Sequence, residues 1–165
     1  MRDLPEATGK TGAPSPTRTK PERPRDRLGR PLDWDAMNEL ELEDFDSKSL
    51  RENHELARVY VREGRYFPAH EAWETAWKQA RGTPDAEFYK GLSQLGAGYV
   101  HLLRGNAHGA KTLMRRASRR VGSYPDGHLG VATTAVHDKL EADADAVERG
   151  DLVPGEGVIF DPPVV

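Results

Sequence analysis

Repeated start and stop signals for helices constrain the fold of this chain more than any other feature. Ser49 followed by Glu52 is a capping box, in which each side chain accepts a backbone N–H that the first helical turn leaves unpaired. Glycine adopts the left-handed conformation of a helix end most readily, and four glycines suit this role: Gly64, Gly82, Gly105 and Gly150. The pattern predicts helices over residues 50–63, 68–81 and 84–104, a fourth that is capped by Asn106 and ends near residue 122, and a fifth over residues 133–149.

No segment shows the period-two alternation of a half-buried strand bounded by hairpin turns. The linkers between the predicted helices are short, which favours antiparallel neighbours. The sequence therefore predicts an all-α domain over residues 49–150, a compact bundle of about five antiparallel helices.

The segments outside this domain have a different composition. Residues 1–31 hold six of the twelve prolines and eight basic against four acidic residues, which predicts a disordered basic tail. Residues 32–48 form an acidic linker or docking segment, for which we expect partial order through four apolar side chains: Trp34, Met37, Leu40 and Phe45. Residues 151–165 are predicted to be extended and to dock through Val158, Ile159 and Phe160.

The chain of 165 residues contains no cysteine, which excludes disulfides, thiolate metal sites and cysteine nucleophiles. Its most apolar stretch, residues 95–103, is short and is interrupted by His101, and its first residues lack the apolar region of a signal peptide. We therefore expect a cytoplasmic protein that does not cross a membrane.

Apolar residues of the second predicted helix form one stripe at helical spacing: Ala69, Ala72, Trp73, Ala76, Trp77 and Ala80. This spacing predicts that both tryptophans lie in the interior, against the third helix. The third helix carries a leucine stripe and a second face of small residues, so we expect it to be covered on both sides, with Gln94 and His101 partly buried.

Polar residues are expected to converge where the second and third helices meet. In an antiparallel hairpin that turns at Thr83, residues whose numbers sum to about 167 lie side by side, so His70 faces Ala97. This register gathers five polar groups: Tyr66, His70, Glu74, Gln94 and His101. His70, Glu74 and His101 are candidate ligands for a divalent metal, with Glu71 or Tyr66 assisting, although the helical angle of Glu71 favours a helix-dipole role.

Three sequence motifs in this region resemble those of a known family. They are F-x-A-H-E-x-W-E-x-x-W from Phe67 to Trp77, G-L-x-Q-L from Gly91 to Leu95, and H-x-x-x-G-N-x-x-G-A from His101 to Ala110. Over residues 58–148 the chain resembles domain-of-unknown-function family 309, small all-helical prokaryotic proteins. The resemblance implies a compact helical fold and no established activity.

The sequence leaves the function open between a helical accessory or protein-interaction domain and a metal-dependent, hydrolase-like enzyme. The first interpretation includes self-association, and turn patterns that repeat 41 residues apart resemble stacked helical hairpins. The second uses His70, Glu74 and His101, but Glu74 stands where the metalloprotease motif requires histidine. A third interpretation, in which the polar cluster is an internal hydrogen-bond network, also remains.

A basic stripe on the fourth predicted helix favours nucleic-acid binding at first sight: Lys111, Arg115, Arg116, Arg119 and Arg120. The fifth helix offers acidic residues that can neutralise this stripe within the domain: Asp138, Glu141, Asp143, Asp145 and Glu148. No nucleic-acid-binding motif is present, so the sequence argues against such a partner.

Overall fold

The computed structural model describes residues 21–165, so the first twenty residues of the expected disordered tail lie outside the described residues. Five α-helices follow one another: α1 (Leu50–Arg62), α2 (Tyr66–Gln79), α3 (Ala86–Leu103), α4 (Ala107–Gly122) and α5 (Thr133–Arg149). Two short 3-10 helices, η1 (Phe45–Ser47) and η2 (His128–Gly130), precede α1 and α5. The described residues contain no strand, and the all-α prediction is confirmed.

The local signals act at both ends of α1 as predicted, whereas α2 and α3 each begin two residues away from the predicted position. Ser49 Oγ accepts the Glu52 N–H at 3.2 Å, and the Glu52 carboxylate accepts the Ser49 N–H at 2.7 Å. Gly64 has a φ of 72° and closes α1 in the left-handed conformation. Helix α2 begins two residues before the predicted position, at Tyr66. Pro68 is then the third residue of the first turn, where its missing N–H still costs no helical hydrogen bond.

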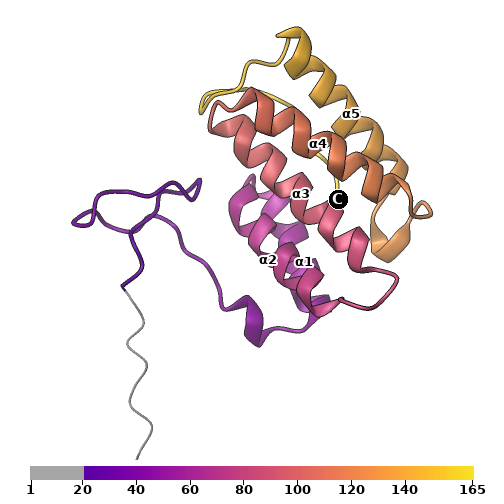
Figure 1. The fold of residues 1–165 in the computed structure, drawn as a ribbon, viewed down its shortest axis with the longest axis horizontal. Coiled ribbons are helices and arrows are strands. Elements are labelled where there is room, and N and C mark those ends of the chain that lie inside the picture. Colours follow the sequence, from indigo (N-terminus) through magenta and orange to yellow (C-terminus); the bar gives the residue numbers. More distant parts are fainter. Residues whose placement is uncertain (1–20) are drawn as a thin grey trace, which may run out of the picture.

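The helices form a row in which consecutive helices pack side by side (Figure 1). Helices α1 and α2 lie on one side of α3, and α4 and α5 lie on the other. Helix α3 contacts both α2 and α4 extensively, so the prediction of a central third helix is confirmed.

Two glycines of α3 allow these close helix contacts. A Cβ at Gly96 would lie 2.9 Å from the Cα of His70 on α2, and a Cβ at Gly98 would lie 3.1 Å from Met114 on α4. His70 therefore lies against Gly96, one residue from the register expected for the hairpin. Gln94 and His101 are partly buried, as predicted.

The two tryptophans of α2 have different surroundings. Trp73 is fully buried, and its Nε1–H donates to Nδ1 of His54 at 3.1 Å. Trp77 is only partly buried; the Lys90 ammonium lies 5.1 Å and the Arg81 guanidinium 5.8 Å from its ring centroid. The prediction of an interior position is confirmed for Trp73 and wrong for Trp77, because the stripe of α2 is wider than the face that α1 and α3 cover.

The buried imidazole of His54 makes the stability of the domain depend on pH. Its Nε2–H donates to the Leu129 carbonyl at 3.0 Å, and its Nδ1 accepts from Trp73. Burial lowers the pKa of His54. The unfolded chain therefore binds this proton more readily, and the free energy of unfolding is expected to decrease as the pH falls below about 6.5, by at most about 1.4 kcal/mol per pH unit.

Urea denaturation between pH 5 and 8 measures this decrease. His54→Gln is expected to be less stable than the wild type at pH 8 but to show a smaller decrease in stability at pH 5. A variant with an unchanged pH dependence would show that His54 is not the group responsible.

The N-terminal arm, residues 21–44, differs in part from the expected tail. Residues 21–31 were predicted to be disordered, but the Asp26 carboxylate accepts the backbone N–H groups of Leu28 and Arg30 at 2.9 and 2.8 Å and closes a turn. Further along the arm Leu40 is buried, whereas Trp34 and Met37, which we expected to dock, are exposed. The arm therefore docks through its first loop and Leu40, while Trp34 and Met37 stay exposed.

The C-terminal segment packs on the helices through alternate residues. The Phe160 ring stacks on Tyr99 with a centroid distance of 5.3 Å, and Val158 also packs against the core. Ile159, expected to dock with them, is 93% exposed. An extended chain turns successive side chains to opposite sides, which accounts for the difference.

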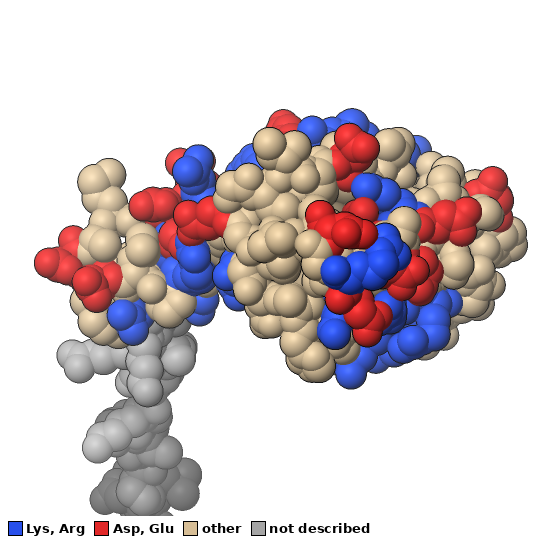
Figure 2. All heavy atoms as spheres, turned by 90° about the horizontal axis from the view of Figure 1, so that it is seen from above, with Lys and Arg blue, Asp and Glu red and all other residues tan. Residues whose placement is uncertain are grey.

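Ion pairs between α4 and α5 neutralise part of the basic stripe. The Arg115 guanidinium lies 2.8 Å from Asp145 and 2.7 Å from Glu148, and Lys111 lies 3.9 Å from Glu148. Figure 2 shows acidic and basic side chains interspersed on one face of the molecule. In the part of the chain that the structure describes, no helix combines the length and the apolar character needed to cross a bilayer.

Candidate metal centre

Three side chains of α2 bring nitrogen and oxygen atoms together at its surface. Nε2 of His70 lies 3.4 Å from a Glu74 carboxylate oxygen and 3.8 Å from a Glu71 carboxylate oxygen. The three ligand atoms all lie within 4.8 Å of one another. Glu74 follows His70 by four residues and Glu71 by three, the two spacings that make side chains neighbours on a helix surface.

The backbone of α3 orients the His70 ring. Nδ1 of His70 lies 3.0 Å from the Ser93 carbonyl oxygen, which can only accept a hydrogen bond, so Nδ1 carries the proton. The Ser93 hydroxyl lies 3.0 Å from the same Nδ1 and donates to the His70 carbonyl. In the neutral ring the lone pair is then on Nε2, as in histidines that bind a metal through one nitrogen and a protein carbonyl through the other.

Nε2 of His70, the ring nitrogen that does not contact Ser93, lies beside two carboxylates. Three electron-rich groups in contact repel one another unless a proton or a metal cation lies between them. The His70, Glu71 and Glu74 side chains are 24%, 35% and 33% exposed, so an ion can reach them from solvent. The arrangement therefore suits a small divalent cation.

Lys78 is the cation that already contacts this group. Its ammonium lies 2.9 Å from the second carboxylate oxygen of Glu74, and its side chain is 53% exposed. An exposed pair of this kind contributes about 0.2–1 kcal/mol, so Lys78 competes only weakly with a divalent ion.

The other residues of the expected cluster have different partners. Gln94 accepts a hydrogen bond from Arg120 at 3.1 Å, and Nδ1 of His101 accepts one from the Asn106 amide at 3.0 Å. Burial, together with the charges of Arg104 and His70, lowers the pKa of His101. His101 thus lies within electrostatic reach of His70 but outside the group of ligand atoms.

Tyr66 lies on the side of α2 that faces the C-terminal segment. Its ring stacks on Tyr99 with a centroid distance of 5.0 Å and lies 6.0 Å from Phe160. Burial raises the pKa of Tyr66 to about 12. The hydroxyl therefore stays protonated at neutral pH, and the residue belongs to the aromatic core rather than to the group around His70.

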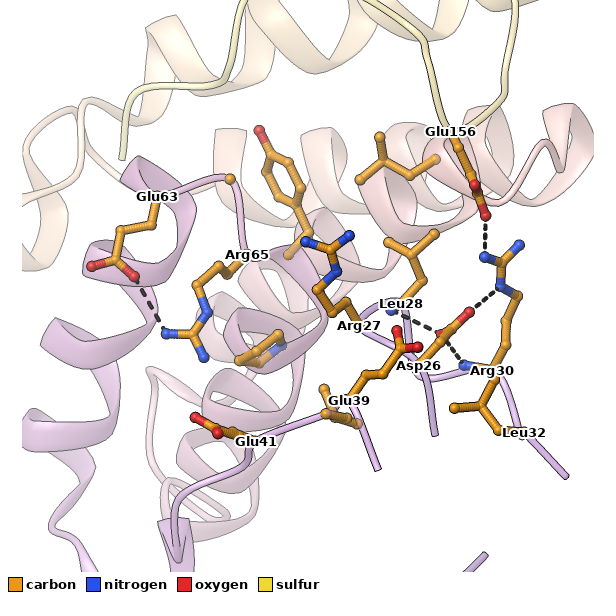
Figure 3. Close-up of a pocket in the computed structure, with 15 residues that line it drawn as sticks. Asp26, Arg27, Leu28, Arg30, Leu32, Glu39, Glu41, Glu63, Arg65 and Glu156 are labelled. Atoms are coloured by element: carbon orange, nitrogen blue, oxygen red, sulfur yellow. Dashed lines mark hydrogen bonds and ion pairs between the residues drawn. The ribbon is translucent and has the colours of Figure 1, made fainter. Parts of the chain in front are cut away.

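A cleft of about 670 Å³ lies between the N-terminal arm and α2, beside Glu71. Glu71 forms part of its wall, together with Phe67 and several residues of the arm. A second cleft of about 830 Å³ is lined by the other side of the arm, the turn before α2 and Glu156 (Figure 3). In Figure 3 the Arg30 guanidinium pairs with both Asp26 and Glu156.

Comparison with known proteins supports the resemblance read from the sequence. The sequence model of a domain of unknown function, DUF309, matches residues 55–113, from the middle of α1 to the first half of α4. No curated protein and no solved structure matches the chain. The matched region includes the three proposed metal ligands and Ser93. Over residues 55–113 the chain is therefore similar to the DUF309 family, whose function is unknown.

Proposed function

We propose that this helical domain binds a divalent first-row transition cation through His70, Glu71 and Glu74. One observation carries the proposal: the contact between Nδ1 of His70 and the Ser93 carbonyl presents the Nε2 lone pair to two carboxylates. Among the residues that the structure describes, no other group of this kind brings three such ligand atoms together.

The donor set agrees with the coordination chemistry of such ions. One imidazole nitrogen and two carboxylate oxygens suit Zn²⁺, Mn²⁺ and Fe²⁺, and three protein ligands leave a position for water or another ligand. In a tetrahedral site the ligand atoms are roughly 3.3 Å apart. The His70 to Glu74 separation of 3.4 Å agrees with this value, and a rotation of the partly exposed Glu71 side chain can shorten the separation of 3.8 Å.

The proposed ligands include Glu71 in place of His101, the third ligand expected from the sequence. The interpretation as a helical accessory domain accommodates a bound cation without a reaction. The hydrolase-like alternative rests on the same group, since a metal with an open position can lower the pKa of a bound water.

Calorimetric titration of the untagged protein with MnCl₂ and with ZnCl₂ tests the proposal. We expect one ion per chain, and His70→Ala and Glu71→Gln are each expected to weaken binding by about tenfold or more, because each removes a ligand. His101→Ala is the matched histidine control and is expected to change the affinity by less than about twofold, with circular dichroism checking that each variant folds. The assignment would be overturned if the wild-type protein bound neither ion, or if His101→Ala and His70→Ala lost equal amounts of metal affinity.

Lys78 allows a test in the opposite direction. Lys78→Gln removes the ammonium that occupies Glu74, so we expect the affinity for Mn²⁺ to increase by about two- to fivefold. Lys90→Gln, which removes the lysine that lies over the Trp77 ring, is the matched control and is expected to leave the affinity unchanged. An affinity that stays the same in Lys78→Gln would place the ion away from Glu74.

A further inference from the structure

We infer that the cleft between the N-terminal arm and α2 binds a small anionic ligand, a carboxylate or a phosphate carrying an apolar group, whose oxygen completes the coordination of the cation. The inference rests on the proposed function, because Glu71 belongs both to the metal ligands and to the wall of the cleft. A volume of about 670 Å³ is ordinary for a small-molecule site.

The walls of the cleft differ in chemistry. Phe67, Leu40 and Leu42 supply apolar surface, and the arm contributes the guanidinium groups of Arg23 and Arg25. Within the arm, Arg23 uses its Nε–H for the Leu32 carbonyl, and Arg25 uses one Nη1–H for the Gly29 carbonyl. A guanidinium has five N–H donors, so each arginine retains donors for a ligand oxygen.

A bound cation changes the charge that a ligand meets in the cleft. The two positive charges of the ion offset the negative charges of Glu71 and Glu74. Arg23 and Arg25 then face one further carboxylate of the lining, Glu22, and Arg23 also lies 3.9 Å from the exposed Asp33. The loaded site therefore attracts an anion, whereas the metal-free site presents its carboxylates and repels one.

A tight contact positions the arm over α2. Gly29 has a φ of 78°, and a Cβ at this position would lie 2.2 Å from the ring of Phe67. Next to it, the Leu28 carbonyl accepts a hydrogen bond from Arg104 at 3.0 Å. An alanine at position 29 has both a strained backbone and a clash with the ring, so Gly29→Ala displaces the arm while the three metal ligands stay on α2.

Phenylphosphonate and benzoate are the probes, since each joins an anionic group to an apolar ring. They are titrated into protein loaded with Mn²⁺ and into metal-free protein, and binding is followed by calorimetry and by the relaxation of water protons on the ion. We expect at least one probe to bind the loaded protein about tenfold more tightly than the metal-free protein and to displace water from Mn²⁺. The preferred probe distinguishes a phosphate from a carboxylate ligand.

Arm variants test the second half of the site. Arg25→Gln and Gly29→Ala are each expected to weaken probe binding by about fivefold or more while the affinity for Mn²⁺ stays within about twofold. Arg27→Gln, which makes the same charge change in the arm but lines the other cleft, is the matched control and is expected to bind the probes normally. If the protein binds Mn²⁺ but neither probe, or if both arm variants bind the probes as tightly as the wild type, this inference alone is overturned. If the protein does not bind Mn²⁺, the inference and the proposed function are both overturned.

Discussion

Replacing Trp73 with alanine is expected to lower the free energy of unfolding by about 3–5 kcal/mol, the range for removing a large aromatic side chain from a close-packed core. The Trp73 side chain of α2 is fully buried in the core, where it contacts His54 of α1. The change also removes the Nε1–H that Nδ1 of His54 accepts, which leaves a buried ring nitrogen without a partner. Urea denaturation followed by circular dichroism at pH 8 measures the loss.

Trp77→Ala is the matched control for this prediction. Its indole is only partly buried, so the same truncation is expected to cost roughly half as much or less. Equal losses in the two variants would contradict the assignment of Trp73 alone to the interior.

Replacing Tyr99 with phenylalanine is expected to lower the free energy of unfolding by about 1.5–3 kcal/mol, the range for a hydrogen bond to a charged group. The Tyr99 hydroxyl donates to the Asp143 carboxylate at 2.6 Å, and Asp143 is only 7% exposed. Burial and the adjacent carboxylate raise the pKa of Tyr99 far above its usual range, so the hydroxyl remains a donor. In Tyr99→Phe the carboxylate retains Lys139, at 3.0 Å, as a partner.

Tyr66→Phe controls for the loss of a hydroxyl from the same stacked pair. Among the described residues the Tyr66 hydroxyl makes no hydrogen bond that its removal would break, so a loss of about 1 kcal/mol or less is expected. Denaturant titration of both variants gives the comparison. A Tyr99→Phe protein as stable as Tyr66→Phe would show that the bond to Asp143 contributes little.

The helix ends could be predicted from the sequence because their causes are local. The capping box at Ser49 involves residues three positions apart, and Gly64 closes α1 through its own backbone conformation. The start of α2 was predicted two residues late because its first residue, Tyr66, follows Arg65, whose side chain makes no capping hydrogen bond. Pro68 was the only local signal, and proline is compatible with several positions of a first turn.

The positions of the candidate site residues along the helices could be predicted from the register of the two helices, but the partners of their side chains could not. The hairpin register placed His70 against α3 to within one residue, and periodicity placed Gln94 and His101 at partly buried positions. The partners of the side chains depend on rotamers, which spacing does not determine. His101 pairs with Asn106 across the turn after α3, whereas Glu71, judged too far around the helix, reaches the His70 ring at the edge of the stripe.

The docked part of the arm could not be predicted from its composition. Proline and charge in residues 21–31 are typical of disorder, but the contact between Gly29 and Phe67 joins positions 38 residues apart, and the ion pair of Arg30 with Glu156 spans most of the chain. Such contacts join residues far apart in the sequence, so no short stretch of sequence predicts them. The same long-range docking creates the cleft beside Glu71.

The location of a bound cation tests the central claim most directly. Crystals grown with MnCl₂ and measured at the manganese absorption edge give an anomalous difference map that locates the ion independently of any variant. We predict a peak about 2.0–2.3 Å from Nε2 of His70 and from one carboxylate oxygen each of Glu71 and Glu74. Crystals at saturating MnCl₂ with no peak at these atoms, or with the ion bound to His101 instead, would contradict it.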